Sequence, residues 1–380
     1  MRIGINALFL IPGKVGGSEV YLRNLLRHLA VIDKKNEYIL FTNKENSGTF
    51  KIDQANFREV LCPIRASFRP VRVLWEQLFL PFQVKKYRID VLHSPGYTAP
   101  VMVPCCSVLT IHDMNCFYYP EDFPKLSALF LKMIVLLSAK RSDKIITISR
   151  NSKKDIVGML KIPENKVCVI YEAGDGHSYP MFDQNVVREK LKGKYGINRE
   201  FILTVSASHP HKNLHRLLQA YNILHKRYRV KHLLILVGIK GRAQYLLKDL
   251  IKELSLKESI IFTGWVPVED LSILYSNADL FVFPSLFEGF GIPVLEAMAY
   301  GIPVISSNAA SMPEVVGDAA ILVNPYDIDE MARAMHEVLT DTNLRDKLTK
   351  KGLRRSKAFS WEETARRTLK VYEETTRIAK

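Results

Sequence analysis

Two glutamates, Glu288 and Glu296, stand eight positions apart in the stretch FEGFGIPVLEAMAYGIPV over residues 287–304. Glu288 belongs to a glycine-containing loop that follows a predicted strand over 280–285. Glu296 comes early in an apolar run opened by Pro293, a residue well suited to the first position of a helix. The pattern therefore predicts one carboxylate in a glycine loop and a second one just inside the helix that follows.

The residues between the two acids are Gly289, Phe290 and Gly291, which this prediction places at the helix N-terminus. Free N–H groups and the helix dipole favour an anion there, such as a diphosphate, and glycine lets a ligand approach the backbone closely. Glu296 would repel a phosphate, so ribose hydroxyls suit it better. Glu288 could accept hydrogen bonds from a sugar. The alternative for such a pair taken alone is that Glu296 supports the helix dipole and Glu288 is solvated.

Other reactive side chains follow predicted strands. Lys212, in SASHPHKN, could neutralise the charge that develops on a departing diphosphate. His112, in TIHD, ends an apolar strand, where a histidine is either structural or part of a reacting centre. Gly16 and Gly17 come after the first strand, and their spacing fits neither a dinucleotide fingerprint nor a P-loop. An ordinary tight turn is the alternative for these glycines.

Short β-branched runs alternate with amphipathic stretches along the whole chain, which is typical of parallel α/β units. A helix is predicted over 18–32 with Ser18 as its N-cap, and a domain junction near 173–198. Two doubly wound domains follow, with ligand sites at the carboxyl ends of strands. Strands are predicted over 2–10, 38–43, 90–95, 107–113, 144–149 and 166–172, then over 201–207, 232–238, 259–265, 280–285, 303–307 and 319–324.

The stretch 275–325, YSNADLFVFPSLFEGFGIPVLEAMAYGIPVISSNAASMPEVVGDAAILVNP, resembles the signature region of family 4 retaining glycosyltransferases. Glu288 and Glu296 match the two glutamates of that family's E-x7-E motif. Similar features recur over nearly the whole chain, in GGSEVYLRNLL, TIHD, ISRNSKKDI, HPHKNLHRLLQAY and FSWEETARRTLKVYEE.

The resemblance implies an α/β chain with the GT-B fold, in which two doubly wound Rossmann-like domains face a cleft. Residues 1–175, with a C-terminal helix at about 360–380, would form the N-terminal acceptor-binding domain. Residues 176–359 would form the nucleotide-sugar-binding domain. The last helix, over 360–378, is expected to return to the N-terminal domain.

Family roles can be carried over to individual residues of this sequence. Glu288 would contact the donor sugar near its C3 hydroxyl, His112 would approach the sugar near C6, and Lys212 would bind the diphosphate. These three are the predicted catalytic residues. The predicted donor-binding residues are Glu296 at the ribose, Gly289, Phe290 and Gly291 at the diphosphate, Gly16 and Gly17 in a loop facing the phosphates, His211, and Val266 near the base.

This sequence departs from the family pattern next to Lys212. Many members have an arginine five positions before the lysine, and a subgroup has one immediately before it. This chain has Ala207 and His211 at those two positions. Diphosphate binding is therefore expected to rest mainly on Lys212 and backbone amides, with His211 as a helper.

Two motifs, TIHDMNCFYYPEDFP and HPHKN, look most like bacterial mannosyltransferases that build O-antigen or exopolysaccharide. The expected reaction is retaining transfer of a hexose, preferably mannose from GDP-mannose, to a glycan or lipid-linked acceptor. One alternative is a glucosyl or N-acetylhexosaminyl transferase that uses a UDP-sugar. Another is a different GT-B enzyme, such as a sugar-nucleotide epimerase.

No cofactor and no metal ion are expected for this chemistry. The histidines at 209, 211 and 215 match no standard metal site. Asp327 and Asp329 have the Asp-x-Asp form of metal-dependent transferases, but they open a predicted helix, where acids favour the dipole. The SMPE sequence over 311–314 is interpreted as a capping box.

Bulk composition describes an ordinary globular chain, with 47% hydrophobic residues and a formal charge of +15. Five cysteines without metal spacing predict free thiols and a cytoplasmic protein. The basic, aromatic-rich region 58–88 is either a solvated loop-and-helix region or a contact with an anionic membrane, which would place the protein at the inner face of the cell membrane. Nucleic-acid binding is the remaining alternative, but no nucleic-acid motif supports it.

Overall fold

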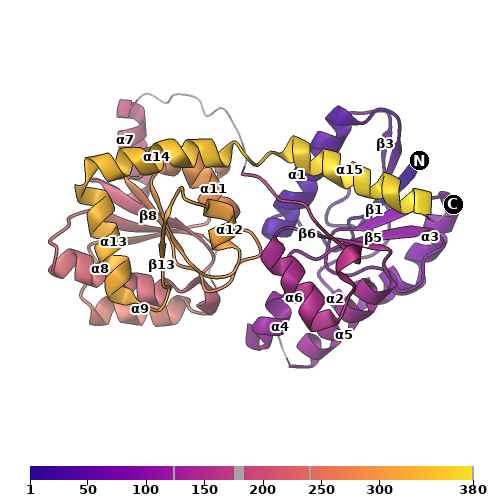
Figure 1. Cartoon of the computed structure of the whole chain (residues 1–380), viewed down its shortest axis with the longest axis horizontal. Helices are drawn as coiled ribbons and strands as arrows, with labels where there is room; N and C mark the ends of the chain where they lie inside the picture. Colours follow the sequence, from indigo (N-terminus) through magenta and orange to yellow (C-terminus); the bar gives the residue numbers. More distant parts are fainter. Residues whose placement is uncertain (123–124, 175–183, 239–240, 379–380) are drawn as a thin grey trace. The chain divides into compact units, whose positions relative to one another are not determined.

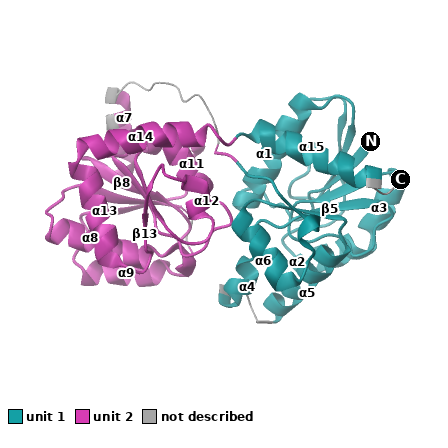
Figure 2. Cartoon of the chain, viewed as in Figure 1, with its two compact units in different colours: residues 1–172, 360–380 teal, residues 173–359 magenta. Residues whose placement is uncertain are grey.

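A computed structural model describes residues 1–122, 125–174, 184–238 and 241–378. The chain forms two compact units (Figure 2). Unit 1 consists of Met1–Glu172 and Ser360–Lys380, and unit 2 of Ala173–Phe359. The junction predicted near 173–198 includes residues 175–183, which lie outside the described residues.

Unit 1 is built on a parallel sheet whose described strands lie in the order β3-β2-β1-β4-β5-β6-β7. Apolar, β-branched runs form its central strands, and Ile3 and Ile5 of β1 are fully buried. The order reverses direction between β1 and β4, which makes this sheet doubly wound. The strands are β1 (Arg2–Asn6), β2 (Glu37–Thr42), β3 (Phe57–Leu61), β4 (Val91–Ser94), β5 (Cys106–Thr110), β6 (Lys144–Thr147) and β7 (Val167–Val169).

Helices lie on both sides of this sheet (Figure 1). The last helix, α15 (Trp361–Ile378), packs beside α1 (Gly17–Ile32) within unit 1, as predicted. It is tied to the sheet by a 2.7 Å hydrogen bond between the Tyr372 hydroxyl and His93 Nδ1. The other helices of unit 1 are α2 (Arg69–Leu78), α3 (Leu80–Lys86), α4 (Asn115–Tyr118), α5 (Lys125–Arg141) and α6 (Arg150–Leu160), with 3-10 turns η1 (Pro120–Asp122) and η2 (Glu164–Lys166).

Unit 2 repeats the plan with the described strand order β10-β9-β8-β11-β12-β13, and all these strands are parallel. The direction reverses between β8 and β11. The strands are β8 (Phe201–Val205), β9 (Leu233–Val237), β10 (Ile260–Gly264), β11 (Leu280–Phe283), β12 (Val304–Ser307) and β13 (Ile321–Val323). The helices are α7 (Gln184–Tyr195), α8 (Leu214–Lys226), α9 (Gln244–Glu253), α10 (Val268–Asn277), α11 (Ile292–Ala299), α12 (Met312–Val316), α13 (Ile328–Thr340) and α14 (Thr342–Ser356), with the 3-10 turn η3 (Pro210–Lys212).

The two doubly wound sheets confirm the predicted fold class. Two local predictions in unit 1 were wrong. Strand β3 was missed, because FREVL is a half-exposed edge strand inside a basic stretch. Ser18 is not the N-cap of α1, since that helix begins at Gly17 with Gly16 in the capping position at φ +61°. Asp327 does cap α13, accepting a 2.8 Å hydrogen bond from the Glu330 N–H.

All five cysteines are free thiols, as predicted. The apolar run over 126–139 lies within α5, which has 17 residues. Within the described ranges, no helix combines the length and the apolar character needed to cross a membrane.

Candidate active site

Lys212 and Glu288 meet where the sheet of unit 2 changes direction. Lys212 ends the turn η3 after β8, and Glu288 lies in the loop after the neighbouring strand β11. Lys212 Nζ is 2.7 Å from Glu288 Oε1, and the two side chains are only 19% and 12% exposed. The ammonium also lies 5.9 Å from the centre of the Phe283 ring. Strand order thus brings together the predicted diphosphate ligand and the predicted sugar ligand.

Asn213 fixes the loop that carries Lys212. Its backbone adopts the left-handed conformation at φ +60°, and its side chain is fully buried. The amide Nδ2 donates to the carbonyl oxygen of Pro284 at 3.0 Å and to that of Pro325 at 2.7 Å. One side chain therefore joins the loops that follow β8, β11 and β13.

The glycine loop ends at the start of α11, which begins at Ile292 with Gly291 as its N-cap. Pro293 is consequently the second residue of the helix, one position later than predicted. Gly291 has φ +106°, and a Cβ built on it would lie 2.4 Å from Met312 Cε. Phe290 is buried with its ring edge against Phe359. This turn presents its backbone N–H groups at the helix N-terminus, the arrangement that suits an anion.

Ser311 orders the same loop and corrects the capping-box prediction for SMPE. It precedes α12 but makes no side-chain cap hydrogen bond. Its buried hydroxyl is instead within hydrogen-bond distance of two carbonyl oxygens of the glycine loop, at 3.0 Å from Glu288 O and 3.1 Å from Phe290 O. Its backbone is helical, with φ −79° and ψ −9°. A capping residue normally has extended dihedral angles, which aim the side chain at the helix N–H groups.

Glu296 is the fifth residue of α11 and is half-buried. Its Oε2 accepts a 2.9 Å hydrogen bond from the hydroxyl of Tyr275, a buried residue of α10. The Tyr275 ring stacks on that of Tyr300, with centroids 5.2 Å apart. The carboxylate is therefore held in a fixed direction one turn away from the glycine loop.

Two further predicted donor ligands belong to unit 2, His211 in the same turn as Lys212 and Val266 after β10. His211 is buried in η3, and its carbonyl accepts a 2.8 Å hydrogen bond from Leu286 N–H, next to the glycine loop. Val266 is buried just after β10. A pocket of about 280 Å³ lies at the ends of β8, β9 and β10, with Ser206, Gly238 and Gly264 among its lining residues.

The remaining predicted site residues belong to unit 1. His112 is buried two positions after β5, with Nε2 3.0 Å from the Pro95 carbonyl and Nδ1 3.4 Å from Glu172 Oε1. The imidazole packs edge-to-face with the Tyr21 ring, and the two ring centroids are 4.9 Å apart. Both ring nitrogens thus have protein partners, which fixes the orientation of the imidazole. Gly17 is the first residue of α1 and Gly16 is its N-cap, and a Cβ on either would meet nothing within 4 Å.

Comparison with known proteins identifies the family. The description "Glycosyltransferase Family 4" matches residues 15–175, and "Glycosyl transferases group 1" matches residues 187–355. The O-antigen chain mannosyltransferase B of Escherichia coli is 32% identical over 290 residues, covering 76% of this chain and 75% of that protein. This chain belongs to glycosyltransferase family 4.

Other similar proteins agree with this assignment. The O-antigen chain mannosyltransferase RfbU of Salmonella typhimurium is 33% identical to the family 4 chain over 221 residues, covering 58% of it and 57% of RfbU. The sucrose-phosphate synthase of Thermosynechococcus elongatus shares its fold, with a TM-score of 0.78 and 20% identity over 98% of both chains. The glycosyltransferase and the GT-B fold predicted from sequence are therefore confirmed. The roles of the individual site residues stay predictions.

Three residues that organise this glycosyltransferase site were not predicted: Asn213, Tyr275 and Ser311. Each lies inside a stretch that resembles the family, but no spacing rule distinguishes it there. Asn213 follows the matched lysine directly, and that position was its only signal. Tyr275 and Ser311 act through partners 21 to 23 residues away, contacts that require the folded chain.

Proposed function

We propose that this glycosyltransferase moves mannose from GDP-mannose to a glycan or lipid-linked acceptor, with retention at the anomeric carbon. One observation carries the choice of sugar: 32% identity over three quarters of a relative named as an O-antigen chain mannosyltransferase. The second relative, RfbU, is named for the same kind of transfer. The sequence resemblance to mannosyltransferases of polysaccharide synthesis supports the same choice.

We assign donor binding to unit 2. The diphosphate would lie at the start of α11, against the N–H groups near Gly291 and the Lys212 ammonium. Glu296 would accept hydrogen bonds from the ribose, and Glu288 from the hexose. The support is the placement of all four groups around one strand-order reversal, where doubly wound sheets bind ligands.

The proposed step is a same-face displacement. The bond between the anomeric carbon and the diphosphate oxygen breaks, and its electron pair leaves with the diphosphate. The acceptor oxygen forms the new bond to that carbon from the same side, and the hydroxyl proton passes to the departing phosphate oxygen. Lys212 and the helix N–H groups stabilise the negative charge on the leaving group, which lowers the barrier without a covalent intermediate.

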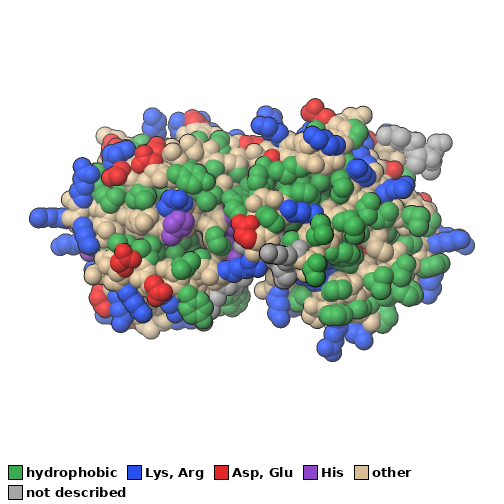
Figure 3. Space-filling view, turned by 90° about the horizontal axis from the view of Figure 1, so that it is seen from below, with side chains coloured by type: hydrophobic (Ala, Val, Ile, Leu, Met, Phe, Trp, Pro, Cys, Tyr) green, Lys and Arg blue, Asp and Glu red, His purple; other side chains and the backbone are tan. Residues whose placement is uncertain are grey.

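We also propose peripheral contact with an anionic membrane, at its cytoplasmic side. Large hydrophobic side chains gather on the face of unit 1 seen at the right of Figure 3, with Lys and Arg around them. Phe82 of α3 is 70% exposed and Leu126 of α5 is 85% exposed. Exposed apolar side chains that gather on one face with cations around them are typical of a surface that binds a partner or a membrane. The exposed apolar residues on and beside α2, α3 and α5 are Phe68, Val71, Leu74, Leu78, Phe79, Phe82, Leu126, Leu129, Phe130, Met133 and Leu137.

The donor assignment is tested by thermal denaturation with GDP-, UDP- and ADP-sugars, followed by mass spectrometry of the transfer product. A ligand that binds only the folded protein raises its melting temperature. GDP-mannose should give the largest shift and should be consumed only when acceptor is present. A larger shift with UDP-glucose or UDP-N-acetylglucosamine would contradict the choice of donor. Epimerised donor in the absence of acceptor would contradict transfer itself.

The membrane assignment is tested by sedimentation with vesicles of phosphatidylcholine, with and without phosphatidylglycerol. The chain should pellet with the anionic vesicles. The pair Leu74→Ser and Phe82→Ser should abolish this, whereas Leu246→Ser, an exposed residue of unit 2, should not. Equal pelleting of all variants would contradict a bilayer contact through α2 and α3.

A further inference from the structure

A pocket of about 640 Å³ opens in unit 1 where its sheet changes direction. The loop after β1 contributes Phe9 and Lys14, and the loop after β4 contributes Gly96 and Thr98. The two loops touch so closely that a Cβ on Gly96 would lie 2.4 Å from the Phe9 ring. Crevices at such a reversal are the usual ligand sites of doubly wound sheets. The sequence predicted that the acceptor binds this unit and that the Gly16–Gly17 loop, whose neighbours Lys14, Val15 and Ser18 line the pocket, faces the donor phosphates, but it predicted no chemical group of the acceptor for this pocket.

Arg72 of α2 lines the pocket and is only 8% exposed. Its Nε and Nη1 atoms are buried without a hydrogen-bond partner within the described ranges. Glu76, one helical turn further along, has its nearest oxygen 3.8 Å from Nη1, which is too far for a hydrogen bond. A buried guanidinium with free N–H groups is costly unless a ligand completes its hydrogen bonds.

Glu76 compensates this charge only in part. It is 1% exposed, its Oε2 accepts a 3.3 Å hydrogen bond from the Thr98 hydroxyl, and its Oε1 has no partner among the described residues. Burial raises the pKa of Glu76, although the charge of Arg72 opposes that shift. Burial likewise lowers the pKa of Arg72. The attraction between the two buried charges therefore offsets only part of the cost of removing them from water.

The other charged groups around the pocket leave it positive. Lys14 and Arg69 line it as exposed cations. Asp113 is the acidic lining residue, and its Oδ1 accepts hydrogen bonds from the Tyr97 hydroxyl at 3.1 Å and from Asn115 N–H at 2.9 Å. With Glu76 beside Arg72 counted as well, three cations face two carboxylates, and this surplus of one positive charge favours an anionic ligand.

We propose that this pocket binds a phosphate group carried by the acceptor, with Arg72 as its main donor and Lys14 and Arg69 at the rim. A guanidinium matches phosphate with two parallel hydrogen bonds, which a neutral sugar hydroxyl cannot replace. The inference rests on the proposed transfer function, because it names the chemistry of the acceptor. The same phosphate chemistry is present in a soluble sugar phosphate and in a lipid-linked phosphate.

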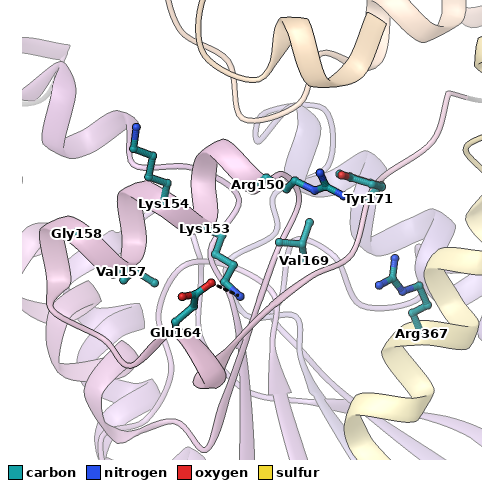
Figure 4. A pocket seen from close by; sticks show the side chains of 9 residues that line it. All are labelled: Arg150, Lys153, Lys154, Val157, Gly158, Glu164, Val169, Tyr171 and Arg367. Atoms are coloured by element: carbon teal, nitrogen blue, oxygen red, sulfur yellow. Dashed lines mark ion pairs between the residues drawn. The ribbon is translucent and has the colours of Figure 1, made fainter. Parts of the chain in front are cut away.

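Another basic groove of unit 1 lacks these features and serves as a control. It has a volume of about 670 Å³, and Arg150, Lys153, Lys154 and Arg367 are among its lining residues (Figure 4). Figure 4 shows Lys153 directed at Glu164, its ion-pair partner at 3.4 Å, and Lys154 extending away from them. Arg367 is exposed. The groove therefore has cations comparable to those of the pocket, but no buried guanidinium.

The test measures binding of mannose 6-phosphate by calorimetry to the full chain, with GDP present in excess to occupy the donor site. Methyl α-mannoside is the neutral control ligand. Wild type should bind the phosphate at least about tenfold more tightly than the neutral sugar, as expected for a charged hydrogen-bonded contact. Equal binding of the two ligands would overturn the proposal.

Variants locate the phosphate. Arg72→Met alone would leave Glu76 buried without its counter-charge, so Arg72→Met is combined with Glu76→Leu, which removes both buried charges. This double variant should lose at least about tenfold in phosphate affinity, and Lys14→Gln with Arg69→Gln should weaken it several-fold. Arg367→Gln should leave it unchanged. Unchanged affinity in the double variant, or an equal loss in Arg367→Gln, would overturn the site.

Calorimetric binding of undecaprenyl phosphate in detergent distinguishes a lipid-linked phosphate from a soluble sugar phosphate. Tighter binding than mannose 6-phosphate would assign the site to a lipid-linked acceptor, and weaker binding to a soluble one. A GDP-mannose binding assay on the double variant separates this inference from the proposed function. Intact donor binding with lost phosphate binding supports the pocket. Wild type that binds phosphate but no GDP-mannose would contradict the donor assignment alone.

Discussion

Lys212 Nζ and Glu288 Oε1 form an ion pair of 2.7 Å between residues that are 76 positions apart in the sequence. The pair exists because β8 and β11 are neighbours and both of their following loops lie at the same edge of the sheet. Each group is a hydrogen-bond partner of the other. A donor would divide them, with its diphosphate at the ammonium and its hexose hydroxyls at the carboxylate, so the pair keeps both groups positioned for binding.

Tyr275→Phe removes the hydroxyl that donates to Glu296 and leaves the ring packing in place. The Glu296 carboxylate then loses the hydrogen bond that orients it for the ribose. We expect the KM for the donor to rise about three- to tenfold with a small change in kcat, the size of one hydrogen bond. Steady-state kinetics with varied donor measure this. Tyr245→Phe, at an exposed position in the same unit, is the control. An unchanged donor KM would contradict the assigned role of Glu296.

Gly291→Ala tests the backbone of the glycine loop. Alanine at φ +106° is strained, and its Cβ would meet Met312 Cε. We expect the free energy of unfolding to fall by about 1–3 kcal/mol, with a loss of donor affinity. Urea denaturation and donor titration measure the two effects. Gly193→Ala, in helix α7 with nothing near its Cβ, should keep or raise stability. Wild-type donor affinity in Gly291→Ala would argue against an anion site at this turn.

Buried His93 predicts a loss of stability in acid. Burial, together with the charge of His112, lowers the pKa of His93 to about 3. The pKa of a histidine in an unfolded chain is about 6.5. Below that pH the unfolded chain therefore binds a proton at His93 that the folded chain does not bind. The stabilising contribution of neutral His93 is therefore complete above about pH 6.5. It declines as pH falls toward 3, by about 1.4 kcal/mol per pH unit.

Denaturation between pH 7 and 4.5 measures this effect on the full chain. His93 lies 2.7 Å from both the Thr110 hydroxyl and the Tyr372 hydroxyl, so the substitution must keep a polar side chain. His93→Gln should lower stability at pH 7 and flatten the dependence on pH in this range. Parallel curves for wild type and variant would show that another group causes the acid sensitivity.

Transfer is predicted to need no metal ion, because Lys212 and the N–H groups at α11 would carry the charge of the leaving diphosphate. Activity should survive dialysis against EDTA with unchanged kcat. Activity that disappears and returns with Mg²⁺ or Mn²⁺ would contradict this prediction.

Much of this architecture could be predicted from the sequence, because buried parallel strands are continuous apolar runs and the helices between them are amphipathic. The failures are local. Strand β3, with the sequence FREVL, was not predicted because its charged residues interrupt the apolar pattern. An edge strand tolerates such charges, whereas a central strand does not. Ser18 and Ser311 carry the right side chain for capping, but capping depends on backbone angles that the sequence does not display.

The site shows the same division. The residue types at strand ends and the family motifs pointed to Glu288, Glu296 and Lys212. The direct contact between Lys212 and Glu288 depends on the strand order β8-β11, which local patterns do not encode. The incomplete hydrogen bonding of the Arg72 guanidinium could not be predicted either. In the sequence Arg72 is one of several basic residues of this region, and only the structure shows that its side chain is buried.

The central claim is that two residues of unit 2 act in transfer, Lys212 by stabilising the leaving diphosphate and Glu288 by binding the donor sugar. Its most direct test is the turnover of GDP-mannose with acceptor by Lys212→Ala and by Glu288→Gln, each checked for native folding by circular dichroism and thermal denaturation. Both variants should remain folded and lose about a hundredfold or more in kcat, as expected when a group that stabilises the leaving charge or orients the sugar is removed. Near-normal turnover in both folded variants would contradict the account.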